Sequence, residues 1–165
     1  MENEQIACLI YDFDKTLSPR DMQEYGFLPG LNIDPDRFWA ECRAFAVANR
    51  MDAVLAYMYK MYEKALLADM ALTRGALMAL GEKVEFFPGV SDWFSRVNRY
   101  GASLGLRVEH YIISSGLQEI IKGSAIAQEF KAVFAAAFLY GPDGRAVWPA
   151  SAVNYTSKTQ YLFRI

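Results

Sequence analysis

The sequence has little cysteine and histidine, with two cysteines and one histidine among 165 residues. Neither Cys8 nor Cys42 belongs to a C-x-x-C pair, so the usual ligands of a structural zinc site are lacking. Cys8 stands in an apolar run and Cys42 on a predicted helix face, and we expect both to be buried free thiols. His110 lies inside a second apolar run, which favours a packed or rim histidine over a ligand.

The sequence also lacks a large excess of either charge. The formal net charge is -2, with 22% charged residues. No long run of one sign occurs, which argues against nucleic acid or an anionic membrane surface as a partner. No apolar stretch is long enough to span a bilayer. The first ten residues, MENEQIACLI, carry acids where a secretory signal would carry basic residues, so we expect a cytoplasmic protein.

Two common nucleotide-binding motifs, G-x-x-x-x-G-K-[ST] and G-x-G-x-x-G, are missing. A G-x-S-x-G pattern does occur at residues 101–105. In serine hydrolases that pattern needs a strand before the serine and a helix after it. Here a helix is predicted before Ser103 and a strand after it, so a serine hydrolase is not favoured.

Short apolar runs alternate with stretches of helical periodicity, which predicts an α/β sheet. The first run, Ile6 to Tyr11, has the pattern of a strand buried on both faces. The turn Gly141-Pro142-Asp143-Gly144 predicts a hairpin between the third strand and the segment around Val147. We expect strands at 6–11, 108–113 and 132–139. We expect one helix that starts at Pro35, a second at 52–68, and a third that Thr73 caps and Gly81 ends. Three further helices are expected at 90–101, 117–122 and 156–165.

Two carboxylates stand two residues apart directly after the first strand, in Asp12-Phe13-Asp14-Lys15-Thr16-Leu17. Ligands bind at this end of the strands in open parallel sheets. One carboxylate can attack phosphorus to form an aspartyl-phosphate. The other can protonate the leaving oxygen and then remove a proton from the hydrolytic water. Together the pair attracts Mg²⁺, a hard cation that prefers oxygen ligands.

This run resembles the first motif of the haloacid dehalogenase superfamily, Asp-x-Asp-x-Thr-Leu, and Asp12, Asp14, Thr16 and Leu17 match it residue for residue. The resemblance implies that Asp12 is the nucleophile and Asp14 the acid/base, with Thr16 at the substrate. It also implies that Asp12 and the main-chain carbonyl of Asp14 help to hold Mg²⁺.

Two later segments resemble the second and third motifs of the same superfamily. Ser114-Ser115-Gly116 directly follows the second strand, and the resemblance implies that the Ser114 hydroxyl and nearby backbone N–H groups bind phosphate. Lys158 fits the third motif, a cation that balances the charges of the nucleophile and the phosphate. Each segment alone is a weak signal, and their order after Asp12 gives them weight.

The segment from residue 20 to 85 occupies the position where the superfamily often inserts a cap. It resembles the helical cap of phosphoserine-phosphatase-like members. We therefore expect a discontinuous core, residues 1–19 plus 86–165, with a Rossmann-like parallel sheet, and a helical cap at 20–85. The fourth motif, an acidic cluster on a later strand, has no counterpart after Lys158. We therefore expect that the C-terminal strands are missing, which would expose the edge of the first strand and favour self-association.

The sequence thus predicts a Mg²⁺-dependent phosphatase that acts on a small phosphorylated metabolite through an aspartyl-phosphate. Two alternatives remain open. The first is a catalytically incomplete fragment or binding module that keeps the fold. The second is a phosphotransferase, which would use the same aspartyl-phosphate chemistry. The identity of the substrate does not follow from the motifs, because fold analogy does not determine function at that level.

Overall fold

A computed structural model describes residues 5–165 and contains a four-stranded sheet in the order β1-β2-β3-β4. The first three strands are parallel, and the fourth pairs antiparallel with the third. This arrangement confirms the predicted α/β class. Residues 1–4, which hold the acids used above to argue against a secretory signal, lie outside the described residues. The strands are β1 (Gln5–Tyr11), β2 (Leu106–Leu117), β3 (Ala132–Tyr140) and β4 (Ala146–Ser151).

The helices begin and end close to the predicted residues. Asp34 caps α2 by accepting a 2.9 Å hydrogen bond from the Arg37 amide, and Thr73 caps α4 through the Ala76 amide at 3.1 Å. Within residues 5–165, no helix is long and apolar enough to cross a membrane. The helices are η1 (Met22–Glu24), α1 (Phe27–Gly30), α2 (Pro35–Asn49), α3 (Ala53–Leu67), α4 (Arg74–Gly81), α5 (Val90–Ser103), α6 (Gln118–Gly123), η2 (Ala127–Glu129) and α7 (Lys158–Leu162).

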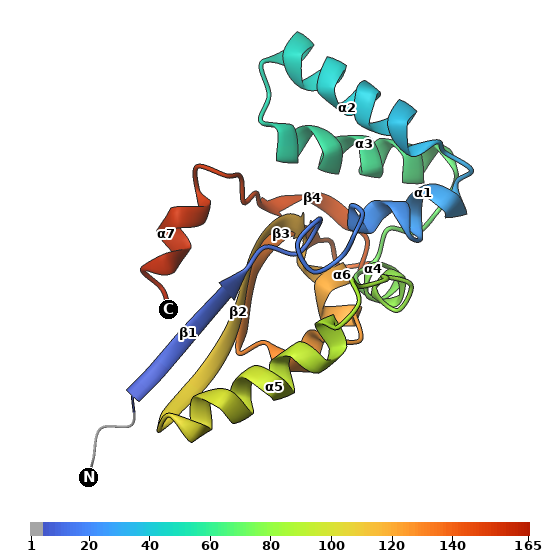
Figure 1. Cartoon of the computed structure of the whole chain (residues 1–165). Helices are drawn as coiled ribbons and strands as arrows, with labels where there is room; N and C mark the ends of the chain where they lie inside the picture. Colours follow the sequence, from blue (N-terminus) through green and yellow to red (C-terminus); the bar gives the residue numbers. More distant parts are fainter. Residues whose placement is uncertain (1–4) are drawn as a thin grey trace.

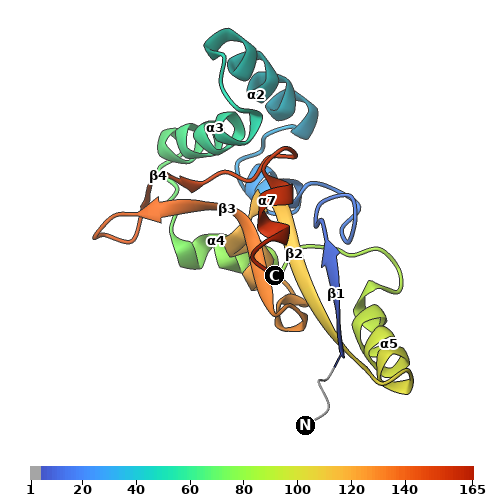
Figure 2. The same ribbon diagram turned by 90° about the vertical axis from the view of Figure 1, so that its left-hand side faces the viewer.

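Helices lie on both sides of the sheet, with α5 on one side and α7 on the other (Figures 1 and 2). The pair α2–α3 stands beyond the end of the sheet where β1 terminates (Figure 1). Helix α4 packs against α6 instead. Their contact needs two glycines, because a Cβ at Gly123 would lie 1.8 Å from the Met78 carbonyl oxygen and one at Gly81 would lie 2.3 Å from the Ile120 carbonyl oxygen. Helix α3 contacts the core as well, through β4. The cap boundaries stay a prediction.

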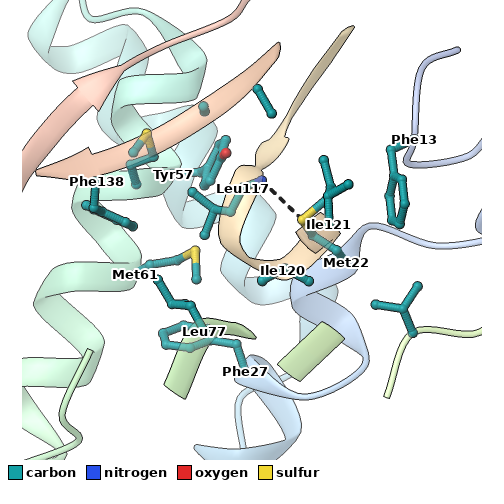
Figure 3. Close-up of a cluster of buried hydrophobic side chains, with 14 of the residues drawn as sticks. Phe13, Met22, Phe27, Tyr57, Met61, Leu77, Leu117, Ile120, Ile121 and Phe138 are labelled. Atoms are coloured by element: carbon teal, nitrogen blue, oxygen red, sulfur yellow. Dashed lines mark hydrogen bonds between the residues drawn. The ribbon is translucent and has the colours of Figure 1, made fainter. Parts of the chain in front are cut away.

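A single buried cluster connects the segment 20–85 to the sheet and its helices (Figure 3). Phe27 and Leu77 from that segment belong to the same cluster as Ile120 of α6 and Phe138 of β3. All four side chains are at most 4% exposed. Burial of each such side chain stabilises the fold by about 1.5–3 kcal/mol. The same cluster contains Phe13 and Leu17 of the loop after β1 and Leu117 at the end of β2, so it holds these two segments together.

The expectation that β1 is buried on both faces was wrong. Ile6 is 46% and Ile10 39% exposed, and Cys8 between them is also exposed, so the expected burial of that thiol was wrong too. The cause is the position of β1 at the sheet edge, where it pairs with β2 alone. The other face is partly covered, since Tyr11 packs on Phe94 of α5 with ring centroids 5.9 Å apart. An apolar run shows which side chains favour burial, and it does not show how many neighbours cover them.

Three other expectations for single residues are confirmed. Cys42 is a buried free thiol. His110 is packed, with its ring nitrogens 2.9 Å from the Tyr11 hydroxyl and 2.9 Å from the Asn98 side-chain oxygen, and burial lowers its pKa. Ser103 ends helix α5 and precedes β2, so the strand-turn-helix arrangement of a serine hydrolase is lacking at that serine.

Candidate active site

Asp12 lies directly after β1, at the C-terminal edge of the parallel strands. One of its carboxylate oxygens accepts a 2.8 Å hydrogen bond from the Phe13 amide. The other forms an ion pair with the ammonium group of Lys158, the first residue of α7. The Asp12 side chain is 42% exposed, so a ligand can reach it. The fold thus brings together two of the predicted residues that are 146 positions apart in the chain.

Lys158 is positioned by a turn that also contacts the helical segment. The Ser157 amide donates to the Asn154 side-chain oxygen at 2.8 Å. The Asn154 amide group in turn donates to Asp52 at 2.9 Å, and Asp52 caps α3. Asn154 therefore connects the lysine-bearing turn to the helix pair. Nothing in the sequence indicated this contact, because the two residues are 102 positions apart.

Asp14 differs from Asp12 in its surroundings. Its Oδ1 accepts a 2.9 Å hydrogen bond from the Met22 amide. Burial, followed by the nearby charge of Asp21, raises the pKa of Asp14 to about 8. At neutral pH this carboxyl group therefore holds a proton, as a general acid must before it acts. The two acids are two residues apart, and the fold gives them different surroundings.

The segment Ser114-Ser115-Gly116 is part of β2, whereas we expected it to follow the end of that strand. The pairing of β2 with β3 shifts register between Ser114 and Leu117, which bends the strand here. The Ser114 hydroxyl is buried and accepts a 3.0 Å hydrogen bond from the Gly116 amide. The Ser115 carbonyl accepts a 2.7 Å hydrogen bond from the Tyr57 hydroxyl of α3. The segment is thus fixed by two hydrogen bonds, one from its own Gly116 amide and one from Tyr57 of the helix pair α2–α3.

Gly116 allows the end of β2 and the loop after β1 to approach each other. A Cβ at this position would lie 2.1 Å from the terminal methyl carbon of Met22 and 2.9 Å from an Asp14 carboxylate oxygen. The Met22 sulfur also lies 3.1 Å from the Leu117 amide (Figure 3). Met22 therefore contacts both motifs through its backbone and its side chain. Sequence reasoning missed Met22, since a methionine carries no chemical signal for such a role.

These residues surround a cavity of about 660 Å³ at the edge of the sheet. Asp12, Asp14 and the segment Ser114-Ser115-Gly116 line it, together with residues of η1, α2 and α3. Lys158 borders an adjoining hollow that also touches Asp12. Thr16 is exposed and does not line the cavity, so the structure does not bring this predicted residue to the others. The volume suits a small molecule.

The oxygen donors at the cavity fit Mg²⁺ in kind. Asp12 supplies a carboxylate and Asp14 a main-chain carbonyl, and Mg²⁺ commonly binds through one or two carboxylates while it keeps several waters. Among residues 5–165, no group of three or more His, Cys, Asp or Glu side chains gathers where it could hold a metal ion. Within this part of the chain, the protein ligands available at the cavity are therefore few.

Comparison with known proteins supports the fold. No protein-family model matches the sequence. An uncharacterized protein from Borreliella burgdorferi is 31% identical over 148 residues, which cover 84% of this chain and 52% of that protein. A solved haloacid dehalogenase (HAD) family hydrolase from Salmonella enterica serovar Typhi has a TM-score of 0.63 and 14% identity, covering 95% of this chain and 50% of its own. The chain thus spans about half the length of both.

Two further solved structures are similar over almost the whole chain. A phosphoserine phosphohydrolase-like protein from Francisella tularensis has a TM-score of 0.61 and 18% identity, covering 97% of this chain and 74% of that one. Phosphoserine phosphatase from T. onnurineus has a TM-score of 0.56 and 15% identity, covering 99% and 72%. The chain has the fold of the haloacid dehalogenase superfamily, in its phosphoserine-phosphatase-like form.

Proposed function

We propose that this chain carries the reactive part of a Mg²⁺-dependent phosphatase that forms an aspartyl-phosphate on Asp12. The observation that supports it most is that the first two motifs line one cavity and that the third, through Lys158, pairs with Asp12 beside it. Asp12 is accessible and paired with Lys158, and a protonated Asp14 stands beside it. The partner we propose is a small phosphorylated metabolite. Cytoplasmic location stays a prediction from the sequence.

In the first step, a carboxylate oxygen of Asp12 attacks phosphorus, and the bond between phosphorus and the leaving oxygen breaks. Asp14 gives its proton to that leaving oxygen, which departs as an alcohol. Its raised pKa keeps the proton available at neutral pH. Lys158 orients the attacking carboxylate and offsets negative charge as it accumulates near phosphorus.

In the second step, the ionised Asp14 removes a proton from water, and the water oxygen attacks phosphorus. The bond between phosphorus and Asp12 breaks, which releases inorganic phosphate and restores the free carboxylate. Asp14 is then protonated again for the next cycle. When bound by Asp12 and the Asp14 carbonyl, Mg²⁺ would supply positive charge that lowers the repulsion between the phosphate and the nucleophile.

Hydrolysis of 4-nitrophenyl phosphate with and without Mg²⁺ tests this proposal. Asp12→Asn should remove nearly all turnover, because an amide does not form the acyl-phosphate. Asp92→Asn on the exposed first turn of α5 is the matched control and should keep parental activity. Near-normal turnover by the Asp12 variant would exclude Asp12 as the nucleophile. Transfer of phosphate to an added alcohol in place of water would favour the phosphotransferase alternative.

The scarcity of acidic ligands favours one further candidate, a catalytically incomplete form with the same fold. Titration with Mg²⁺, followed by the thermal midpoint of unfolding, separates the two. A complete site should be stabilised by submillimolar Mg²⁺ and should hydrolyse the aryl phosphate. An incomplete site should respond only at far higher Mg²⁺ and turn over little.

A further inference from the structure

The placement of Lys158 beside Asp12 is not explained by the helix that carries it. Helix α7 has only five residues, and none of them is buried. So short a helix is marginal without support from neighbouring elements. A ring contact between Tyr161 and Phe134 of β3, with centroids 5.3 Å apart, supports the far end of the helix. The position of Lys158 at its start therefore depends on the turn before it.

The turn from Asn154 to Lys158 lies in the link between β4 and α7 (Figure 1). The side-chain oxygen of Asn154 accepts a hydrogen bond from the Ser157 amide at 2.8 Å. The main-chain carbonyl of Asn154 accepts another from the Lys158 amide at 3.0 Å. The Asn154 amide donates to the Ser157 hydroxyl at 2.9 Å, and Val153 directly before it is fully buried. Asn154 thus closes the turn through the two residues nearest to the ammonium group.

A carboxylate of the helix pair α2–α3 engages the remaining group of Asn154. The side-chain N–H of Asn154 donates to one oxygen of Asp52 at 2.9 Å. The other oxygen of Asp52 caps α3, because it accepts hydrogen bonds from the Val54 and Leu55 amides at 2.8 and 3.2 Å. Both ends of the Asn154 side-chain amide are therefore used, one by the lysine-bearing turn and the other by α3.

We propose that Asn154 is a positioning residue that holds Lys158 against Asp12, and that it does so through its hydrogen bond to Asp52. This inference rests on the proposed function, since it concerns the cation of that reaction. With the bond intact, the ammonium group stays paired with the nucleophile. Without it, the turn moves away more often and the ion pair is populated less. A hydrogen bond to a carboxylate is strong enough to shift such an equilibrium by about tenfold.

Asp52→Asn breaks this hydrogen bond and keeps the helix cap. The oxygen of the new asparagine can still accept from the two amides of α3, and asparagine caps helices as well as aspartate does. Its NH₂ group then faces the NH₂ group of Asn154, and two donors do not pair. The exchange variant, Asp52→Asn with Asn154→Asp, restores the bond with donor and acceptor reversed. Asp34→Asn, at the exposed cap of α2, is the matched control.

The kinetic test measures kcat of the full chain with 4-nitrophenyl phosphate. Asp52→Asn should lower kcat by about tenfold, the exchange variant should recover most of this loss, and Asp34→Asn should match the parent. In a Lys158→Met background, Asp52→Asn should have little further effect, because substitutions that act through one group are not additive. A loss of equal size in both backgrounds would overturn the inference, since Asn154 and Asp52 would then act independently of Lys158. An exchange variant that recovers nothing would overturn it as well.

Acetylation of Lys158 by acetic anhydride, followed by mass spectrometry, tests the inference without turnover. The Lys158 side chain is 24% exposed and paired with Asp12, so it should react slowly. Release of the turn in Asp52→Asn should raise its rate by up to about tenfold, while Asp34→Asn and the exchange variant should keep the slow rate. The exposed Lys83 in the same digest is the internal reference. An unchanged rate in Asp52→Asn would show that Asn154 does not hold Lys158 in place.

The two proposals fail in different ways. If 4-nitrophenyl phosphate is hydrolysed and Lys158 reacts equally in all variants, the phosphatase proposal stands and the positioning role of Asn154 is refuted. If no ester is hydrolysed, the phosphatase proposal fails, and the acetylation rates still decide whether Asn154 holds Lys158.

Discussion

Replacing Asp14 by asparagine should make the protein more stable at neutral and alkaline pH. The folded protein holds the Asp14 proton up to a pH of about 8, while the ordinary pKa of the group is 3.8. Between these values the folded state binds a proton that the unfolded state has lost. Stability therefore falls as the pH rises from about 4 to about 8, and above that range both states are ionised. Asparagine is neutral throughout and removes this dependence.

The magnitude follows from the size of the pKa shift. Each pKa unit corresponds to about 1.4 kcal/mol, so the parent should lose up to about 5 kcal/mol of unfolding free energy across this pH range. Asparagine can still accept the 2.9 Å hydrogen bond from the Met22 amide. The variant should therefore match the parent near pH 4 and exceed it at pH 8. For a chain of this length, 1 kcal/mol shifts the midpoint of thermal unfolding by about 2–4 °C.

The assay is thermal and urea unfolding between pH 4 and 9 with a chelator present. The chelator matters because a bound cation would favour the ionised carboxylate. Asp92→Asn, on the exposed surface of α5, should give a profile parallel to that of the parent. Parallel profiles for the parent and the Asp14 variant would refute the reasoning, since they would show that Asp14 is ionised in the folded protein.

Three further predictions follow from contacts at the site. Lys158→Met should lower kcat by about 10²-fold, because it removes the cation paired with Asp12. Initial rates near the parental value would contradict a catalytic role for Lys158. Gly116→Ala should destabilise the protein by about 1–3 kcal/mol in urea unfolding and lower its activity, since its Cβ meets neighbouring atoms at 2.1 and 2.9 Å. Gly75→Ala is the matched control, because its Cβ meets nothing within 4 Å, and it should stabilise α4. The exposed edge of β1 should cause self-association, seen as light scattering that rises with protein concentration. Ile6→Lys should reduce this association. A parent protein that is monomeric at all concentrations would contradict the prediction.

The helices of the segment 20–85 were predicted well because their signals are local. Asp34 and Thr73 cap the helices that follow them through amides three residues away. Such contacts depend only on neighbouring residues, so the chain carries them wherever the helix lies. The burial of β1 was predicted wrongly because it depends on which elements cover the strand, and Cys8 is exposed for that reason.

The sequence by itself determined the α/β class and the order of the motifs, and it predicted chemistry on phosphorus at Asp12. These depend on short patterns, such as two acids after an apolar run, and the structure places Ser114 and Lys158 near Asp12 as their order in the chain indicated. Only the tertiary structure decided that burial raises the pKa of Asp14 to about 8, and that the side-chain oxygen of Gln23 is buried with no hydrogen-bond partner among residues 5–165. Both properties arise from burial by residues far apart in the chain, and burial sets the free energy of a charge or a hydrogen bond.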